Sequence, residues 1–167
     1  MANTYQIAPS DALHCMQSAL NKYHYRLIEN GVSIALLALY SADGEPALMC
    51  HGAPAYAVTR ILPLKLRAHG LADAEITIDF TSWMRLSDPK RMAVMDHELT
   101  HIRPVFEDGI CVRDDLGRPK LKLRDHDFQF GWFNEVAERH RESSIEVEQA
   151  SQIINTTGQL YFEFPKV

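Results

Sequence analysis

The sequence is poor in cysteine, in long apolar runs and in excess basic charge, and each shortage excludes a class of protein. Its three cysteines are scattered through 167 residues without a CxxC pair, which excludes a disulfide framework and predicts reduced, buried thiols in a cytoplasmic protein. The longest apolar run, residues 34–40, is too short to cross a bilayer. No basic segment followed by an apolar one marks a signal peptide. A formal net charge of −5 gives no general attraction to nucleic acid or to an anionic membrane.

The composition is that of a globular protein with a core. Hydrophobic residues make up 46% of the chain and charged residues 23%, which are ordinary fractions for a soluble domain. A chain of 167 residues is long enough to bury a core as one unit. No internal repeat, low-complexity segment or interdomain linker is visible, so we expect residues 1–167 to form a single domain.

A His-Glu-x-x-His motif occupies residues 97–101. His97 and His101 are four positions apart, so in a helix their rings lie one turn apart on the same face. Glu98 lies between them around the helix and can reach a water on a metal ion. This arrangement typically holds zinc and places a general base beside it.

The motif lies inside a predicted helix. Asp88 can cap the helix start, Pro89 suits its first turn, and residues 90–102 contain neither glycine nor proline. Apolar residues recur at helical spacing and are expected to face the core: Met92, Met95, Leu99 and Ile102. An accidental pair of histidines on a packing helix is the alternative, and the capped helical context disfavours it.

The motif supplies two ligands, whereas a catalytic zinc site usually takes three from the protein and keeps a fourth position for water. The third ligand is expected downstream, and His126 is the best candidate because it stands just before a second helical pattern, residues 128–141. Asp125 or Asp127 can cap that helix or accept the second ring N–H of a ligating histidine. Other candidates stay open: Glu107, Asp108, Asp114, Asp115, Glu135 and His140.

The N-terminal part of the chain is predicted to form one long helix. It covers residues 10–30 and ends at Gly31. Its apolar stripe consists of Leu13, Met16, Leu20, Tyr23 and Leu27. His14 and His24 fall beside this stripe, which predicts helix-surface residues rather than ligands.

Several strands are expected between this helix and the motif. Residues 32–40 predict a buried central strand, and the Asp43-Gly44 turn suggests a hairpin to a short returning strand at 47–50. Because Pro63 argues against a helix, residues 56–66 predict an edge strand. Residues 74–81 alternate between apolar and polar side chains and predict a strand near the helix that carries the His-Glu-x-x-His motif.

The C-terminal part is predicted to combine a hairpin with two helices. Strands at residues 109–113 and 120–124 would form the hairpin that returns the chain to the metal site. After the helix at 128–141, a capping box at 143–146 predicts a last helix to about residue 155, and residues 160–164 a final strand. Core positions of the first of these helices are Phe128, Trp132, Phe133 and Val136. The predicted fold class is α+β.

Basic residues alternate with leucines near the predicted third ligand. Lys120, Lys122 and Arg124 would share one strand face, with Arg113 and Arg118 nearby. This face is either a solvated strand surface or a small basic platform that meets phosphate or an acidic peptide.

Several blocks of the sequence resemble the phage metallopeptidase family. The likeness spans residues 20–148, and the blocks that carry it are residues 96–102, 115–122, 126–128 and 139–140, with residues 70–76 similar as well. The resemblance implies a phage or prophage protein that acts in the cytoplasm of a bacterial host. It also implies a metallopeptidase whose substrate is a peptide or protein.

More distantly, the chain is similar to SprT-like minimal zincins, whose third ligand is a histidine downstream of the motif and is followed by a helix. That likeness supports His126, although Asp127 stands where glycine is usual in that family. It implies a single-domain, minimal zincin-like α+β fold. In such a fold a small mixed or antiparallel sheet packs on helices, including the one that carries the motif.

The hypothesis from these residues is peptide hydrolysis at a zinc site. His97, His101 and His126 would hold Zn²⁺, and Glu98 would take a proton from water and pass it to the leaving amine. The oxyanion stabiliser stays open among Tyr161, His140 and Arg139. Histidine ligands also suit other first-row metals.

Two other functions remain open. One is a DNA-associated protease, as the SprT-like spartan proteins are; the basic strand favours it and the net charge opposes it. The other is a zinc-stabilised binding or inhibitor protein without catalysis, which would have no need of Glu98.

Overall fold

A computed structural model of the chain describes residues 3–50, 53–127 and 132–157, with side chains described up to residue 152. It is an α+β protein built on a four-stranded mixed sheet, as predicted. The strands are β1 (Thr4–Ile7), β2 (Ile34–Tyr40), β5 (Ala57–Ile61) and β6 (Ala74–Asp79), and their order is β1-β2-β6-β5. β2 and β6 run parallel, and the two outer pairs are antiparallel.

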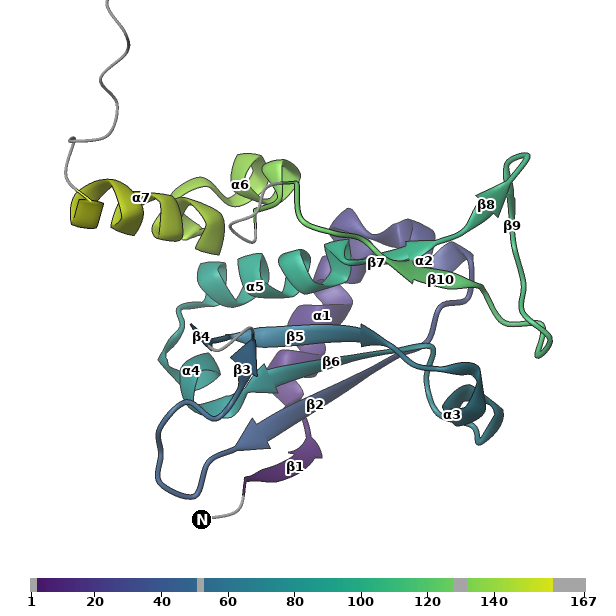
Figure 1. Cartoon of the computed structure of the whole chain (residues 1–167), viewed down its shortest axis with the longest axis horizontal. Coiled ribbons are helices and arrows are strands. Elements are labelled where there is room, and N and C mark those ends of the chain that lie inside the picture. The colour runs from purple at the N-terminus through teal and green to yellow at the C-terminus, as the bar shows by residue number, and fades with distance from the viewer. Residues whose placement is uncertain (1–2, 51–52, 128–131, 158–167) are drawn as a thin grey trace, which may run out of the picture.

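Helices cover the sheet in two further layers. α1 (Ser10–Tyr23) and α5 (Asp88–Thr100) pack directly on the sheet, whereas α6 (Asn134–His140), a 3₁₀ turn (Arg141–Ser143) and α7 (Ile145–Thr157) pack on the outer side of α5 (Figure 1). The core between the sheet and α1 and α5 includes Ala12, Leu20, Leu36, Ile76, Ile78, Met95 and Leu99. α5 is therefore the central helix, with protein on both of its sides.

The long N-terminal helix predicted at residues 10–30 is interrupted. At His24 the backbone leaves the helical region, and α2 (Tyr25–Glu29) follows as a separate turn. The ring of His24 lies 2.6 Å from Asp96 of α5, so a tertiary contact accompanies the break, and the prediction of a surface histidine was wrong. The predicted stripe is confirmed in part, because Leu20 and Leu27 are buried as expected, whereas Leu13 is exposed and Ala12 and Ala19 are buried as well.

The stop at Gly31 is as predicted. Gly31 has φ +72°, a conformation that glycine adopts without penalty. Its N–H donates to the carbonyl of Ile28, and the N–H of Val32 donates to the carbonyl of Leu27. This pair of bonds is the Schellman arrangement that closes a helix at glycine.

The hairpin predicted at Asp43-Gly44 is wrong. Both edges of β2 are already occupied, by β1 and β6, so no returning strand can pair with it. Instead, Asp79 at the end of β6 anchors the loop by accepting from the backbone N–H groups of Ala47 and Leu48 at 2.6 and 2.9 Å. The next residues form a separate ribbon of β3 (Met49–Cys50) and β4 (Ala53–Pro54).

The edge strand predicted at residues 56–66 is confirmed in part. β5 pairs with β6 and ends the four-stranded sheet, but it stops at Ile61, and Pro63 precedes a short helix, α3 (Leu64–Ala68). β6 is buried on both faces rather than on one. Asp79 then caps α4 (Phe80–Arg85) by accepting from the N–H of Ser82, and Trp83 of α4 is buried, as expected for a packing residue.

The chain between α5 and residue 126 forms two small ribbons. β7 (Ile102–Pro104) pairs with β10 (Leu121–Leu123), and β8 (Phe106–Glu107) pairs with β9 (Ile110–Cys111). In Figure 1 the β8–β9 hairpin projects away from the rest of the molecule. The predicted hairpin between residues 109–113 and 120–124 was wrong, because β10 pairs with β7 instead. Near the turn, the N–H of Lys120 donates to the carbonyl of Val112, and an isolated bridge joins Arg113 and Pro119.

The helix boundaries also correct several details. Ser87 rather than Asp88 stands at the N-cap of α5, with Pro89 in its first turn, and α5 ends at Thr100. Within the described residues, the helix predicted at 128–141 begins only at Asn134. α7 is capped by Ser144, whose hydroxyl accepts from the N–H of Val147 at 3.1 Å, instead of by Ser143.

Some predictions fall on residues that the structure does not describe. The final strand at residues 160–164, Tyr161 and Phe128 lie outside the described residues. The three cysteines are free thiols, but the prediction that they are buried was wrong, because Cys15 and Cys111 are half-buried and Cys50 is exposed. None of the helices in the described part of the chain is both long and apolar enough to cross a membrane.

Candidate metal centre

Three histidines from two parts of the chain converge on one point. His97 lies in the last turn of α5, His101 is the C-cap residue of that helix, and His126 follows β10. One ring nitrogen of each lies within 4.8 Å of the others, and the Nε2 atoms of His97 and His126 are 3.2 Å apart. The ring centroids are 4.6 to 5.2 Å apart. The structure therefore brings together the three histidines that the sequence analysis selected.

Hydrogen bonds on the far side of two rings set which nitrogen faces the cluster. The Nδ1 atom of His97 lies 2.7 Å from a carboxylate oxygen of Glu146, and that of His101 lies 2.8 Å from the backbone carbonyl of Arg124. An ionised carboxylate and a carbonyl can only accept, so both Nδ1 atoms carry the proton. Both Nε2 atoms are left with a lone pair, which is the form that binds a metal.

The donor set fits a zinc ion. Two ligands at about 2.0–2.1 Å from one tetrahedral ion lie about 3.3 Å apart, close to the 3.2 Å between the Nε2 atoms of His97 and His126. Two ring nitrogens at that distance need a proton or a cation between them. Three neutral imidazoles suit zinc and also several other first-row metals.

Glu98 lies beside the cluster in a dry environment. Its side chain is 5% exposed, and Oε2 accepts a 2.7 Å hydrogen bond from the hydroxyl of Thr59 on the edge strand β5. Burial raises the pKa of Glu98, and it outweighs the opposing effects of His97 and of the Thr59 hydrogen bond. A carboxylate with a raised pKa is a better proton acceptor than a free one.

The three rings differ in their electrostatics. Burial lowers the pKa of His101 to about 4, and burial together with the charge of His97 lowers that of His126. Burial also acts to lower the pKa of His97, but its hydrogen bond to Glu146 and the surrounding carboxylates outweigh burial and raise the pKa. The lowered pKa values of His101 and His126 favour the neutral form of those two rings.

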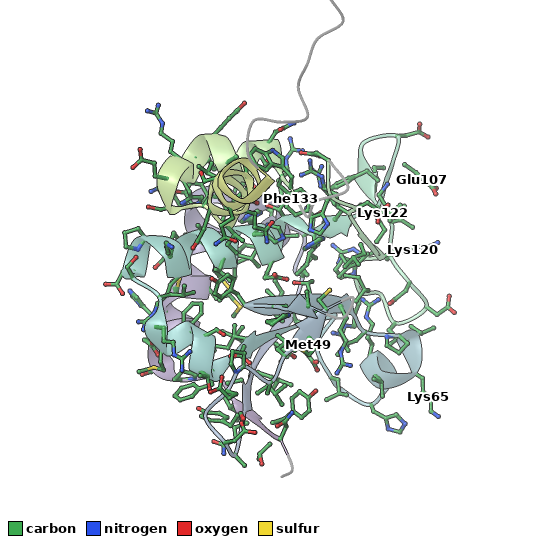
Figure 2. The ribbon with its side chains drawn as sticks, turned by 60° about the vertical axis from the view of Figure 1, so that its left-hand side comes forward. Met49, Lys65, Glu107, Lys120, Lys122 and Phe133 are labelled. Carbon is green, nitrogen blue, oxygen red and sulfur yellow. The ribbon has the colours of Figure 1, made fainter. Side chains whose placement is uncertain are left out.

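Phe133 forms an apolar wall against all three histidines. Its ring centroid lies 4.8, 4.8 and 4.9 Å from those of His97, His101 and His126, and the side chain is fully buried. In Figure 2 Phe133 lies between the C-terminal helices and α5. Phe133 was predicted to be a core residue, and the structure shows that its part of the core adjoins the three histidines.

Glu146 is the residue that sequence reasoning missed. Its side chain is fully buried, and beyond the Oε1 contact with His97 its Oε2 has no hydrogen-bond partner among the described residues. The capping-box pattern had assigned Glu146 to the start of α7. Instead it forms a carboxylate–histidine pair, the usual device for orienting a ligating ring.

Asp96 is another buried carboxylate, and it joins the helices behind the cluster. It accepts from His24 at 2.6 Å, from Arg139 at 2.6 and 2.7 Å, and from His140 at 2.8 Å. These bonds outweigh burial and lower the pKa of Asp96 well below its ordinary value. Arg139 and His140, which stood open as oxyanion stabilisers, are engaged here.

The remaining alternative ligands lie outside the histidine cluster. Asp114 pairs with Arg67, and Glu135 bonds Arg124 and Arg139. Glu107 and Asp108 are exposed in the β8–β9 hairpin, and Asp115 is exposed as well. Among the described residues, the three histidines are the one group of His, Cys, Asp and Glu side chains that could hold a metal.

The basic residues near His126 have different surroundings. Lys120 and Lys122 are exposed and project from the same side of the molecule (Figure 2). Arg124 is instead paired with Asp127 at 2.7 Å and with Glu135. Arg118 is 2.8 Å from Asp73, and Arg113 is exposed.

Comparison with known proteins gives one match. A family model described as "Putative phage metallopeptidase" matches residues 6–156, a range that includes α5, His126 and Glu146. Neither a curated protein nor a solved structure matches the chain.

Proposed function

The chain belongs to the phage metallopeptidase family, and from this premise we propose that it is a zinc peptidase with Glu98 as general base. The observation that carries the proposal is the convergence of three ring nitrogens within 4.8 Å of one another, beside a buried carboxylate. A purely structural zinc site is usually closed by four protein ligands. Three ligands next to a buried base are the arrangement of a hydrolytic site.

Each residue has a defined role in this proposal. His97, His101 and His126 would hold the ion, which when bound supplies a Lewis acid and lowers the pKa of water to about 7. Glu98 accepts the proton of the attacking water and passes it to the leaving amine. Thr59 holds the Glu98 carboxylate in place through its 2.7 Å hydrogen bond.

The edge strand β5 is the proposed support for the substrate. β5 has one partner in the four-stranded sheet, β6, and its Thr59 touches Glu98. An extended peptide can add to a free strand edge through main-chain hydrogen bonds. The edge therefore lies where a bound peptide would present a carbonyl to the base, and we propose a peptide or protein substrate met in the cytoplasm of a bacterial host.

The decisive experiment separates metal binding from turnover. We expect Glu98→Gln to retain one zinc per chain by metal analysis while peptide hydrolysis falls at least about 10³-fold, because the amide cannot accept the proton. His126→Ala should lose zinc under the same conditions. Zinc loss in Glu98→Gln, or full occupancy in His126→Ala, would contradict these assignments.

The same variants test the non-catalytic alternative. If the zinc-loaded wild-type protein cleaves no peptide, and a binding partner captured by it is captured equally by Glu98→Gln, the peptidase proposal is wrong.

A further inference from the structure

A shallow, positively charged groove lies beside the histidine cluster. It has a volume of about 400 Å³, and its lining residues are Arg103, Lys122, Leu123, Arg124 and Asp125. Three of these five side chains are cations and one is an anion. The groove therefore carries surplus positive charge on a molecule whose formal net charge is −5.

Two of the cations face each other across a strand pair. Lys122 of β10 is the direct partner of Arg103 of β7, and directly opposed residues share one face of a ribbon. Like charges in that position repel each other and destabilise the pair. An anion placed between them would relieve the repulsion.

Neighbouring carboxylates leave these two cations largely unneutralised. The nearest carboxylate oxygen to Arg103 belongs to Glu135 at 3.7 Å, which is too far for a hydrogen bond. Glu135 is itself bonded to Arg124 and Arg139. Lys122 is exposed and has no ion pair with any residue that the structure describes.

Arg124 is not available to a ligand in the same way. Its guanidinium is held by Asp127 and Glu135 and lies 4.8 Å over the ring of Phe133. Its role is to fix the segment that carries His126. The pair left for a ligand is therefore Arg103, whose ion pair with Glu135 is long, and Lys122. It differs from the set that strand alternation had suggested.

The groove adjoins the reacting centre through the backbone. The carbonyl of Arg124 accepts from Nδ1 of His101, and Asp125 directly precedes His126. The Cα atoms of residues 124 and 126 can be at most about 7 Å apart. An extended peptide advances about 3.3 Å per residue, so a side chain in the groove belongs to a residue within about two positions of the scissile bond.

We infer that Arg103 and Lys122 form a subsite for an Asp or Glu side chain of the substrate. The inference rests on the proposed peptidase activity. Guanidinium and ammonium groups both form charge-assisted hydrogen bonds with carboxylates. A nucleic acid fits less well, because backbone binding uses several phosphate contacts, and here two exposed cations stand on a molecule of opposite net charge.

The test compares acidic with neutral peptides of the same shape. Two libraries of internally quenched peptides differ only in carrying Asp or Asn at the two positions on either side of a randomised bond. With the zinc-loaded wild-type protein we expect a kcat/KM about tenfold higher for the Asp library, equivalent to about 1.4 kcal/mol. In the double variant Arg103→Gln, Lys122→Gln the ratio should fall to about one.

Two further variants sharpen the comparison. Lys65→Gln removes an exposed cation from α3 outside the groove (Figure 2) and should keep the tenfold ratio. The single change Lys122→Glu, at an exposed position, should reverse the ratio so that Asn peptides are cleaved faster.

Each outcome decides between the subsite and the activity. Equal cleavage of both libraries by the wild-type protein, or a ratio that the double variant keeps, overturns the subsite and leaves the peptidase proposal standing. No cleavage of either library contradicts the proposed function and the subsite with it. Salt-sensitive retention on single-stranded DNA that the double variant loses, without any Asp preference, assigns the groove to nucleic acid and overturns the inference.

Discussion

Glu146 acts on the candidate metal centre through a single atom. Its Oε1 accepts a hydrogen bond from the Nδ1–H group of His97, so the carboxylate fixes both the tautomer and the orientation of that ring. Such outer carboxylates usually change metal affinity by about 10–100-fold when they are removed. The residue contributes no ligand of its own, and yet the geometry of one ligand depends on it.

We therefore expect Glu146→Gln to weaken zinc binding about tenfold or more. Gln keeps the shape but loses the charge, and its N–H₂ group would face a buried place where Oε2 has no partner among the residues that the structure describes. Competition with a zinc chelator measures the dissociation constant directly. The matched control is Glu148→Gln on the same helix, which removes the partner of Lys90 and should leave zinc affinity within about twofold. Equal affinities for the two variants would contradict this role.

Sequence reasoning found the residues of the cluster that a local pattern encodes. His97, Glu98 and His101 lie within one turn and a half of one helix, so their spacing alone places them together. His126 could be selected because it stands just before a second helical pattern, and the likeness to SprT-like zincins supported it. Glu146 and Thr59 are 49 and 39 residues away from the groups that they bond, and no spacing rule encodes contacts between separate elements.

Asp96 joins α6 to α5. Arg139 and His140 of α6 both bond its carboxylate, and His24 reaches it from the junction of α1 and α2. The carboxylate is fully buried. Three elements thus meet on one charge, directly behind His97.

Removal of that charge should loosen all three elements together. We expect Asp96→Asn to lower the free energy of unfolding by about 3 kcal/mol, because the ion pair of this buried carboxylate with Arg139 and its hydrogen bonds from His24 and His140 are disrupted. Urea denaturation followed by circular dichroism measures the change. Asp88→Asn, at an exposed position of the same helix, should shift the midpoint far less. Similar midpoints for the two variants would show that Asp96 does not hold the elements together.

The elements that sequence predicted correctly are those that depend on their own residues. The central strand β2 follows from its apolar run, the stop at Gly31 from the conformational freedom of glycine, and the helix around the motif from its uninterrupted periodicity. The two wrong hairpins concern pairing. The Asp43-Gly44 turn gives no hairpin because β2 is already paired on both sides, and β10 pairs with β7 rather than with the residues just before it. Asp108 and Gly109, both at positive φ, form a turn that pairs β9 with β8 instead of with the predicted strand at 120–124.

Buried aspartates join the layers of the whole molecule. Asp73 bonds Ser33 before β2 together with Arg67 and Arg118, Asp79 anchors the loop after β2, and Asp96 connects α5 with the outer helices. Burial alone would raise the pKa of each of these carboxyls. Hydrogen bonds outweigh burial in all three cases, so each pKa is lowered. The fold is therefore stabilised by the ionised form of these groups.

The stability of the molecule should consequently fall in acid. Because each pKa is lower in the folded than in the unfolded chain, the unfolded chain binds more protons between the two values, and stability rises with pH there. The stabilisation is fully present above about pH 4, the ordinary carboxyl value, and is lost as the pH falls through the lower values of the folded state. Urea midpoints measured with a chelator present, so that metal release does not contribute, should drop steeply below pH 4. Between pH 7 and 5 the lowered pKa values of His101 and His126 add a separate fall, which the raised pKa of His97 opposes.

Variants identify which groups cause the drop. Each such carboxyl contributes up to about 1.4 kcal/mol per pH unit within its window, so Asp79→Asn should make the acid limb shallower by about that amount. Asp115→Asn, at an exposed turn position, should leave the slope as it is. A limb that keeps its full slope in Asp79→Asn, and in Asp73→Asn and Asp96→Asn as well, would mean that the acid sensitivity arises elsewhere, and the three aspartates would then be packing groups whose charge contributes nothing.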